Sequence, residues 1–187
     1  MPYRRVDFHP NGYYHLYNRG VNYQTIFFEK ENYLFFLRRL EKHFNPEDIE
    51  VLAYCLMPNH YHLMVYLKKG HLSDLFQPFL VSYTKAINNR YGRTGPLFQG
   101  PFKAVQIEKD DYLLQLSRYI HLNPVKASLV NHPEDWEFSS YRVYLERPNE
   151  NITRPETILG FFKSPLEYQQ FVESQEESTP IEPLLFD

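Results

Sequence analysis

The stretch Ile49–Leu67 reads IEVLAYCLMPNHYHLMVYL, and it decides the fold. Its first part, Ile49–Leu56, is a short apolar run of the length of a buried strand. Met57-Pro58-Asn59 breaks that run, and His60–Leu67 then gives a second strand-like segment. Two such segments joined by so short a break predict a β-hairpin.

The segments on either side of this hairpin extend the pattern into a fold. Strands are expected over Tyr13–Val21 and Phe102–Glu108, and helices over Lys30–Phe44, Leu72–Tyr91 and Tyr112 to about Leu122. Pro78 predicts a kink or a late start in the second of these helices. The order is strand, helix, strand, strand, helix, strand, helix. This order predicts an α+β fold, a ferredoxin-like or RRM-like sandwich with an antiparallel sheet and helices on one face.

The last part of the chain differs in composition from the rest. Residues 1–130 hold 16 Lys and Arg against 11 Asp and Glu, whereas residues 131–187 hold 4 against 12. Such a mildly basic body is compatible with DNA binding. Pro and Glu are frequent over 146–187, where Ser164–Glu173 is the one helical candidate. We therefore expect a domain over 1–145 and an acidic, partly helical C-terminal extension over 146–187 with a mobile tail.

Cysteine content and hydropathy restrict the class of protein. Cys55 is the only cysteine, which excludes an internal disulfide, and its apolar neighbours predict a core position. No stretch approaches the roughly 18 apolar residues of a membrane helix, and the first residues lack the apolar segment of a signal peptide. These features predict a cytoplasmic protein without a membrane partner. The 15 Phe, 16 Tyr and 1 Trp fill a core or, where exposed, can stack on unpaired bases.

His60 and His62 are the first candidates for chemistry. Side chains at positions i and i+2 of a strand share a face, so the two imidazoles can reach one cation. Neutral imidazole is a common ligand of divalent metals. Tyr61 between them faces the opposite side, where a large ring can enter the core. Two surface histidines, or a histidine packed against an aromatic ring, would give the same pattern.

The helix that begins after Asp110-Asp111 carries two stripes. Gln115, Tyr119 and Asn123 follow one another at helical spacing, so they share a polar side. Pro124 disfavours helical geometry at the residue before it, which leaves Asn123 either within the helix or as its cap. A tyrosine on a polar stripe is not simply core filler. The stripe expected to face the core consists of Leu113, Leu116 and Ile120.

Five strings of the sequence together carry a specific resemblance to a known family. The chain resembles the single-tyrosine HUH transposases, and among them the REP-associated tyrosine transposases. HUH stands for histidine, bulky hydrophobe, histidine, and Tyr61 fills the middle position. The matching strings are YHLYNRG at Tyr14–Gly20, AYCLMPNHYHLMV at Ala53–Val65, LFQGPFK at Leu97–Lys103, RYIHLNPVKASLV at Arg118–Val130 and DWEFSSY at Asp135–Tyr141.

The resemblance implies a reaction and a set of roles. Tyr119, in RYIHLNP, stands at the position of the family's nucleophile, and His60, His62 and Asn123 stand where its proteins hold a divalent metal, Mg²⁺ or Mn²⁺. Such enzymes are single-strand DNA endonucleases and strand transferases. They act at hairpins with single-stranded flanks through a 5′-phosphotyrosine intermediate. The REP-associated group suits monomers, although small relatives include homodimers. The other tyrosines considered for the role, Tyr83, Tyr91 and Tyr112, do not stand at that position.

Six basic residues are candidates for contacts to DNA phosphates. Three lie near the N-terminus and three flank a Gly-rich loop. Each could equally be an ordinary solvated charge. They are Arg4, Arg5, Arg19, Arg90, Arg93 and Lys103.

Two other functions fit parts of the sequence. A non-catalytic single-stranded nucleic-acid-binding protein on the same fold would use an aromatic sheet face and need no metal. The joint presence of His60, His62 and Tyr119 argues against it, because binding alone does not require that set. An HUH nuclease of replication or conjugation is usually part of a longer chain with further domains. We therefore expect a hairpin-directed transposase.

Overall fold

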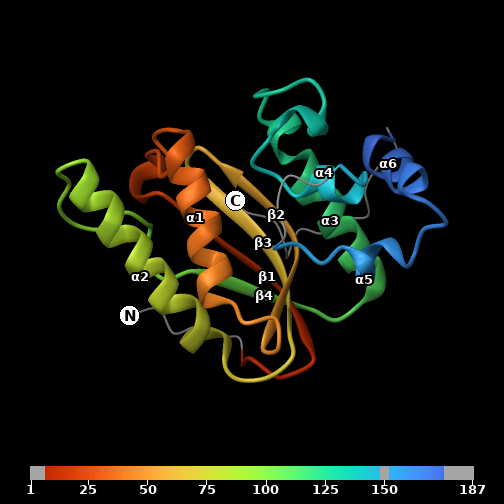
Figure 1. Ribbon diagram of the computed structural model, residues 1–187, viewed down its shortest axis with the longest axis horizontal. Helices are drawn as coiled ribbons and strands as arrows, with labels where there is room; N and C mark the ends of the chain where they lie inside the picture. Colours follow the sequence, from red (N-terminus) through yellow and green to blue (C-terminus); the bar gives the residue numbers. More distant parts are fainter. Residues whose placement is uncertain (1–6, 148–151, 175–187) are drawn as a thin grey trace.

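A four-stranded antiparallel sheet forms the centre of the protein (Figure 1). The computed structural model describes residues 7–147 and 152–174. The strand order is β2-β3-β1-β4, and β2 pairs with β3 in the predicted hairpin. Along the chain, the strands and the three long helices follow one another in the predicted order. The strands are β1 (Gly12–Arg19), β2 (Ile49–Met57), β3 (His60–Leu67) and β4 (Lys103–Ile107).

Helices cover both faces of this sheet. Helices α1 (Lys30–His43) and α2 (Leu72–Arg90) lie on one face, and α3 (Asp110–Lys126) lies on the other (Figure 1). The expected α+β sandwich is confirmed. The expectation that its helices lie on one face holds for α1 and α2, whereas α3 covers the other face. The reason is that β2 is apolar along nearly its whole length, so both of its faces need cover. The shorter helices are η1 (Val21–Tyr23), η2 (Pro133–Asp135), α4 (Tyr141–Tyr144), α5 (Glu156–Leu159) and α6 (Pro165–Glu173).

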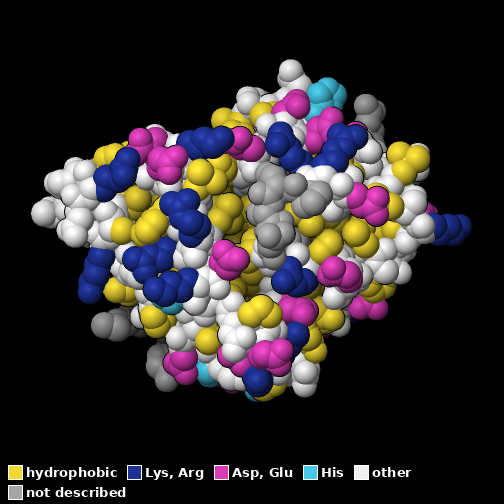
Figure 2. Space-filling model, viewed as in Figure 1, with side chains coloured by type: hydrophobic (Ala, Val, Ile, Leu, Met, Phe, Trp, Pro, Cys, Tyr) yellow, Lys and Arg dark blue, Asp and Glu magenta, His cyan; other side chains and the backbone are white. Residues whose placement is uncertain are grey.

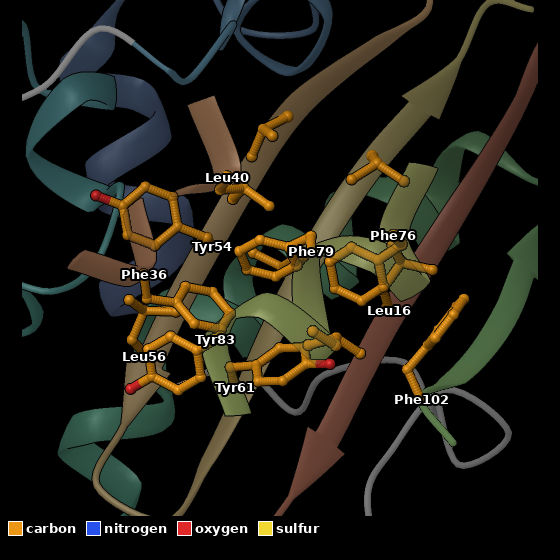
Figure 3. Close-up of a cluster of buried hydrophobic side chains, with 14 of the residues drawn as sticks. Leu16, Phe36, Leu40, Tyr54, Leu56, Tyr61, Phe76, Phe79, Tyr83 and Phe102 are labelled. Carbon is orange, nitrogen blue, oxygen red and sulfur yellow. The ribbon is translucent and has the colours of Figure 1, made fainter. Parts of the chain in front are cut away.

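The core beneath α1 and α2 is built from interlocking rings (Figure 3). Phe36 on α1 is fully buried, and its ring centroid lies 4.7 Å from that of Phe79 and 5.3 Å from that of Tyr61. The Phe36–Phe79 pair packs edge-on, which adds to the stabilisation that ring burial gives. Tyr61, the residue between the two histidines, thus enters this core as predicted.

The core beneath α3 contains the stripe that the helical spacing predicted. Leu113, Leu116 and Ile120 are buried there against apolar side chains of β2 and β3. Cys55 is fully buried in the same core, as expected.

The described part of the C-terminal extension packs onto α3. Helix α6 begins after Ser164, whose hydroxyl accepts a hydrogen bond from the Glu167 N–H at 3.2 Å. The predicted helix over Ser164–Glu173 is therefore present. Its Tyr168 and Val172 are fully buried in the core of α3. The tail expected over 175–187 lies outside the described residues.

Both prolines that were expected to disturb helices lie inside them. Pro78 lies within α2 and Pro124 within α3. Helix α3 continues to Lys126, so Asn123 is a buried helical residue and not the cap. The end of the helix is closed by the Ala127 N–H, which donates to the Asn123 carbonyl at 3.0 Å. None of the helices in the described ranges combines the length and apolar character that crossing a membrane requires.

Candidate active site

The alternation of side chains along β3 places His60 and His62, at positions i and i+2, on the α3 side of the sheet. The ring centroids of His60 and His62 lie 5.1 Å apart. On the neighbouring strand β1, Arg19 pairs with His60 and Tyr17 pairs with His62. The site is therefore a patch of polar side chains on a sheet face that is otherwise apolar.

Helix α3 adds two further predicted residues to this patch. The Tyr119 ring stands edge-on to His62, with the two centroids 5.3 Å apart. One turn later, Asn123 Oδ1 lies 3.2 Å from His60 Nε2. Tyr119 and Asn123, four positions apart on α3, therefore lie opposite His62 and His60, two positions apart on β3. All four residues that the sequence singled out for catalysis and metal binding lie in one place.

His60 contacts two amide oxygens, and this arrangement suits a cation. Its Nδ1 lies 2.7 Å from Asn59 Oδ1, and its Nε2 lies 3.2 Å from Asn123 Oδ1. Amide oxygens only accept hydrogen bonds, and a neutral imidazole has a single N–H. Burial lowers the pKa of His60, which disfavours the doubly protonated ring. If the proton is on Nδ1, which makes the closer contact, then Nε2 and Asn123 Oδ1 face each other as two acceptors. A cation that both atoms contact would satisfy them.

His62 is also in the form that a metal requires. It is fully buried, and burial, with smaller contributions from the neighbouring His15 and His60, holds its pKa well below the ordinary value. Metal ligation needs neutral imidazole, so no proton has to be removed at neutral pH. Within the described ranges no three His, Cys, Asp or Glu side chains are grouped to hold a metal ion. The set that fits a cation here is two imidazoles and the Asn123 amide oxygen.

Two of the predicted DNA-binding residues lie beside this site. Arg19 pairs in register with His60, and its Nε donates to Gln99 Oε1 at 2.5 Å. Lys103 Nζ lies 5.7 Å from the centroid of the Tyr17 ring, next to His62. Arg19 and Lys103 therefore flank the histidines on the β1 and β4 side.

Two further predicted DNA-binding residues, Arg90 and Arg93, are not at this site. Arg90, in the last turn of α2, forms an ion pair of 2.6 Å with Glu29, and the Arg93 guanidinium lies 5.6 Å from the Phe28 ring centroid. Figure 2 shows the side of α1 and α2, where Lys and Arg side chains are interspersed with Asp and Glu. Arg4 and Arg5 lie outside the described residues.

The competing tyrosines occupy other environments. Tyr83 is fully buried beneath α2, where its hydroxyl donates to the Ile26 carbonyl at 2.9 Å. The Tyr91 hydroxyl donates to Glu29 Oε1 at 2.6 Å on the same side of the sheet. Tyr112 lies on α3, two turns before Tyr119, with Lys109 Nζ 5.5 Å from its ring centroid. Among the four candidate tyrosines, Tyr119 is the one that lies against a candidate metal ligand, because its ring stands edge-on to that of His62.

Sequence reasoning missed two side chains at the site. His15 is fully buried on β1, with its Nε2 3.0 Å from His62 Nδ1. Lys126 Nζ lies 5.2 Å from the centroid of the Tyr119 ring, and burial, with a smaller contribution from Arg118, lowers the Lys126 pKa. Both belong to strings that carried the resemblance. The alternation of β1 could have placed His15 on the side of Tyr17 and Arg19, but only the strand order brings it to His62.

His121 lies on the far side of α3 from this site. It is fully buried, with Nδ1 2.7 Å from the Tyr168 hydroxyl and Nε2 2.9 Å from Ser140 Oγ. Burial lowers its pKa to about 3. Although His121 is only two positions after Tyr119, its ring is directed to these partners and not to the site. His121 joins α3 to α6 and to the segment before α4.

Comparisons with known proteins give a family and a fold. A family model described as transposase IS200 like matches residues 9–123, which is more than half of the chain and includes His60, His62 and Tyr119. No curated protein gives a significant match. The solved structure of a REP-associated tyrosine transposase bound to a REP hairpin is 20% identical, and the match covers 82% of this chain and 91% of that one with a TM-score of 0.68. A candidate transposase from Deinococcus radiodurans is 14% identical over 64% of this chain and 95% of that one, with a TM-score of 0.42.

Proposed function

Because the chain belongs to the IS200-like transposase family, we propose that this transposase cleaves and rejoins single-stranded DNA with Tyr119 as its nucleophile. The observation that carries the proposal is the placement of Tyr119 and Asn123, one turn apart on α3, against His62 and His60. A nucleophile next to a candidate metal site is the arrangement that phosphoryl transfer needs. We assign this chemistry to residues 1–145, with the extension over 146–187 supporting α3 through α6.

The reaction proceeds at the phenol oxygen of Tyr119. That oxygen attacks the scissile phosphorus, the bond from phosphorus to the 3′ oxygen breaks, and the phosphate stays on the 5′ end as a phosphotyrosine. The phenol gives up its proton, and the leaving 3′ oxygen takes up a proton to become a hydroxyl. Attack by a second 3′ hydroxyl on the phosphotyrosine rejoins DNA without ATP, because the new phosphodiester replaces the one that was broken.

The neighbouring Lys126 assists the loss of the Tyr119 proton. A phenol has an ordinary pKa near 10, so little phenolate is present at neutral pH. The Lys126 ammonium, 5.2 Å from the centroid of the Tyr119 ring, is a positive charge that favours the anion. His121 is turned away and takes no part in this step.

The metal site consists of His60, His62 and Asn123. Proteins of this family generally use divalent ions, and we propose Mg²⁺ or Mn²⁺ here. When bound, such an ion supplies the positive charge that polarises the scissile phosphate and orients it for in-line attack. His60 and His62 would each contribute a neutral ring nitrogen, and Asn123 its amide oxygen.

The DNA substrate is proposed from the fold and from the charges beside the site. The solved relative with the same fold is bound to a REP hairpin. We propose that this protein acts in the cytoplasm, as a monomer, on DNA hairpins with single-stranded flanks. Arg19 and Lys103 are the best placed of the basic residues to hold phosphates near the histidines. Arg4, Arg5, Arg90 and Arg93 remain candidates for contacts farther along the DNA.

A cleavage assay with a matched control tests the nucleophile. Labelled single-stranded hairpins from repeats that flank the gene are incubated with Mg²⁺ or Mn²⁺ and with wild type, Tyr119→Phe or Tyr112→Phe. We expect a covalent protein–DNA adduct with wild type and with Tyr112→Phe, and none with Tyr119→Phe or after chelation of the metal. Binding without an adduct in wild type, for every hairpin and metal, would favour the non-catalytic nucleic-acid-binding protein.

A further inference from the structure

A second buried histidine stands behind the candidate metal ligand His62. His15 lies on β1 and is fully buried, and its ring stacks on that of His62 with centroids 5.2 Å apart and planes at 23°. His15 pairs in register with Met64, so its contact with His62 is the diagonal one across two strands. The two rings meet through His15 Nε2 and His62 Nδ1, which lie 3.0 Å apart.

A hydrogen bond between two imidazole nitrogens can form in only two ways when both rings are neutral. In the first, His62 Nδ1–H donates to His15 Nε2, and His62 Nε2 keeps its lone pair. In the second, His15 Nε2–H donates to His62 Nδ1, and the proton of His62 is then on Nε2. Only the first form can ligate a cation through Nε2, because a protonated ring nitrogen has no lone pair to offer. The Nδ1 nitrogen is occupied in either form.

We propose that His15 is a positioning residue, which accepts the Nδ1 proton of His62 and thereby presents the Nε2 lone pair of His62 to the cation beside Tyr119. Partners of this kind fix the tautomer and the orientation of a ligating histidine. His60 has a comparable partner, because its Nδ1 lies 2.7 Å from Asn59 Oδ1. The inference rests on the proposed function, since the cation belongs to that proposal.

The tautomer of His62 can be read without any metal. Nitrogen NMR of the metal-free protein, labelled with ¹⁵N at histidine, distinguishes Nδ1–H from Nε2–H. We expect Nδ1–H at His62 in wild type and a shift toward Nε2–H in His15→Phe, which keeps a ring but removes the acceptor. Cys55→Ala is the packing control, because Cys55 is the fully buried partner of His62 on β2; it should keep Nδ1–H. Nε2–H in wild type, or no change in His15→Phe, would overturn the inference.

Binding of Mn²⁺, followed by the EPR signal of the free ion, separates this inference from the proposed function. We expect His15→Phe to bind Mn²⁺ about 10- to 100-fold more weakly than wild type, the usual effect of removing such a partner. His15→Gln, whose amide oxygen can accept the same proton, should recover most of the affinity, and Cys55→Ala should bind like wild type. Thermal unfolding of each variant shows that it is folded.

Two outcomes of that titration have different meanings. Equal Mn²⁺ affinity in wild type and His15→Phe would overturn the positioning role while the metal site stands. Absence of Mn²⁺ binding in wild type would overturn the metal site and this inference together.

Discussion

The two faces of the sheet use the same strands for different purposes. The face beneath α1 and α2 is lined by rings such as Phe36, Phe79 and Tyr61, which are fully buried and contact one another. The face beneath α3 interrupts its apolar core with the buried side chains of His15, His62 and Asn123. Since successive residues of a strand face opposite ways, neighbours such as Tyr61 and His62 can be fitted to stability and to chemistry separately.

This difference predicts opposite behaviour for neighbouring residues of β3. Tyr61→Ala should lower the free energy of unfolding by about 3–5 kcal/mol, the range for removing a buried ring. His60→Ala, at a partly exposed position, should lower it by less than about 1 kcal/mol while abolishing the DNA adduct. Urea denaturation and the adduct assay on the same preparations measure both quantities. A Tyr61→Ala protein as stable as wild type, or a His60→Ala protein that still forms the adduct, would contradict the assignment of one face to stability and the other to chemistry.

His121 sharpens the comparison, because it is a histidine on the α3 side that we expect to act as a core residue. Replacing it by Phe keeps a ring but removes the two ring nitrogens that contact the Tyr168 hydroxyl and Ser140 Oγ. We expect His121→Phe to lower the free energy of unfolding by about 1–3 kcal/mol, as for a lost buried hydrogen-bond partner. The adduct rate per folded molecule should stay close to that of wild type. Loss of the adduct at unchanged stability would give His121 a catalytic role instead.

The two faces should also differ in how their arginines contribute to DNA binding. Arg19→Gln should weaken hairpin binding several-fold and reduce the slope of log affinity against log salt by about one, the effect of one lost phosphate contact. Arg38→Gln is the matched control, because Arg38 is an exposed arginine on α1, on the opposite face of the sheet, and is not among the candidates for DNA contacts. Fluorescence anisotropy at several salt concentrations measures both variants. Equal slopes for the two would mean that the DNA is not held preferentially at the α3 side.

The smallest expected effect concerns the support of α3 by α6. Ser164→Ala removes the hydroxyl that accepts from the Glu167 N–H, and should lower the free energy of unfolding by about 1 kcal/mol, as for a lost helix cap. Ser73→Ala, near the start of α2 on the other face, is the comparison. Hydrogen exchange of α6 amides should accelerate in Ser164→Ala and not in Ser73→Ala. Unchanged exchange in α6 would show that the cap contributes little.

The parts of the structure that follow from short-range periodicity were predictable. The hairpin, the shared face of His60 and His62, and the spacing of Tyr119 and Asn123 all depend on residues within a few positions of one another. The apolar stripe of α3 belongs to the same group.

The parts that depend on strand order were not predictable in this way. His15 reaches His62 because β1 lies between β3 and β4, and nothing local to β1 specifies that order. The placement of α3 on the face opposite α1 and α2 is likewise a property of the whole packed molecule. Pro124 left two possibilities for Asn123, within the helix or as its cap, and only the packed structure, in which Asn123 is buried within α3, decides between them.

The hydrogen bonds between α3 and α6 have a consequence for the stage of synthesis at which the protein can become active. Arg118, the residue before the nucleophile, donates to the main-chain carbonyls of Val172 and Ser174, and Tyr168 contacts His121. These partners are translated about fifty residues after Tyr119, whereas both histidines of β3 emerge well before it. A growing chain on the ribosome can therefore form its sheet before α3, which carries the nucleophile, is bound to α6. A chain that stops short of α6 would lack these stabilising contacts.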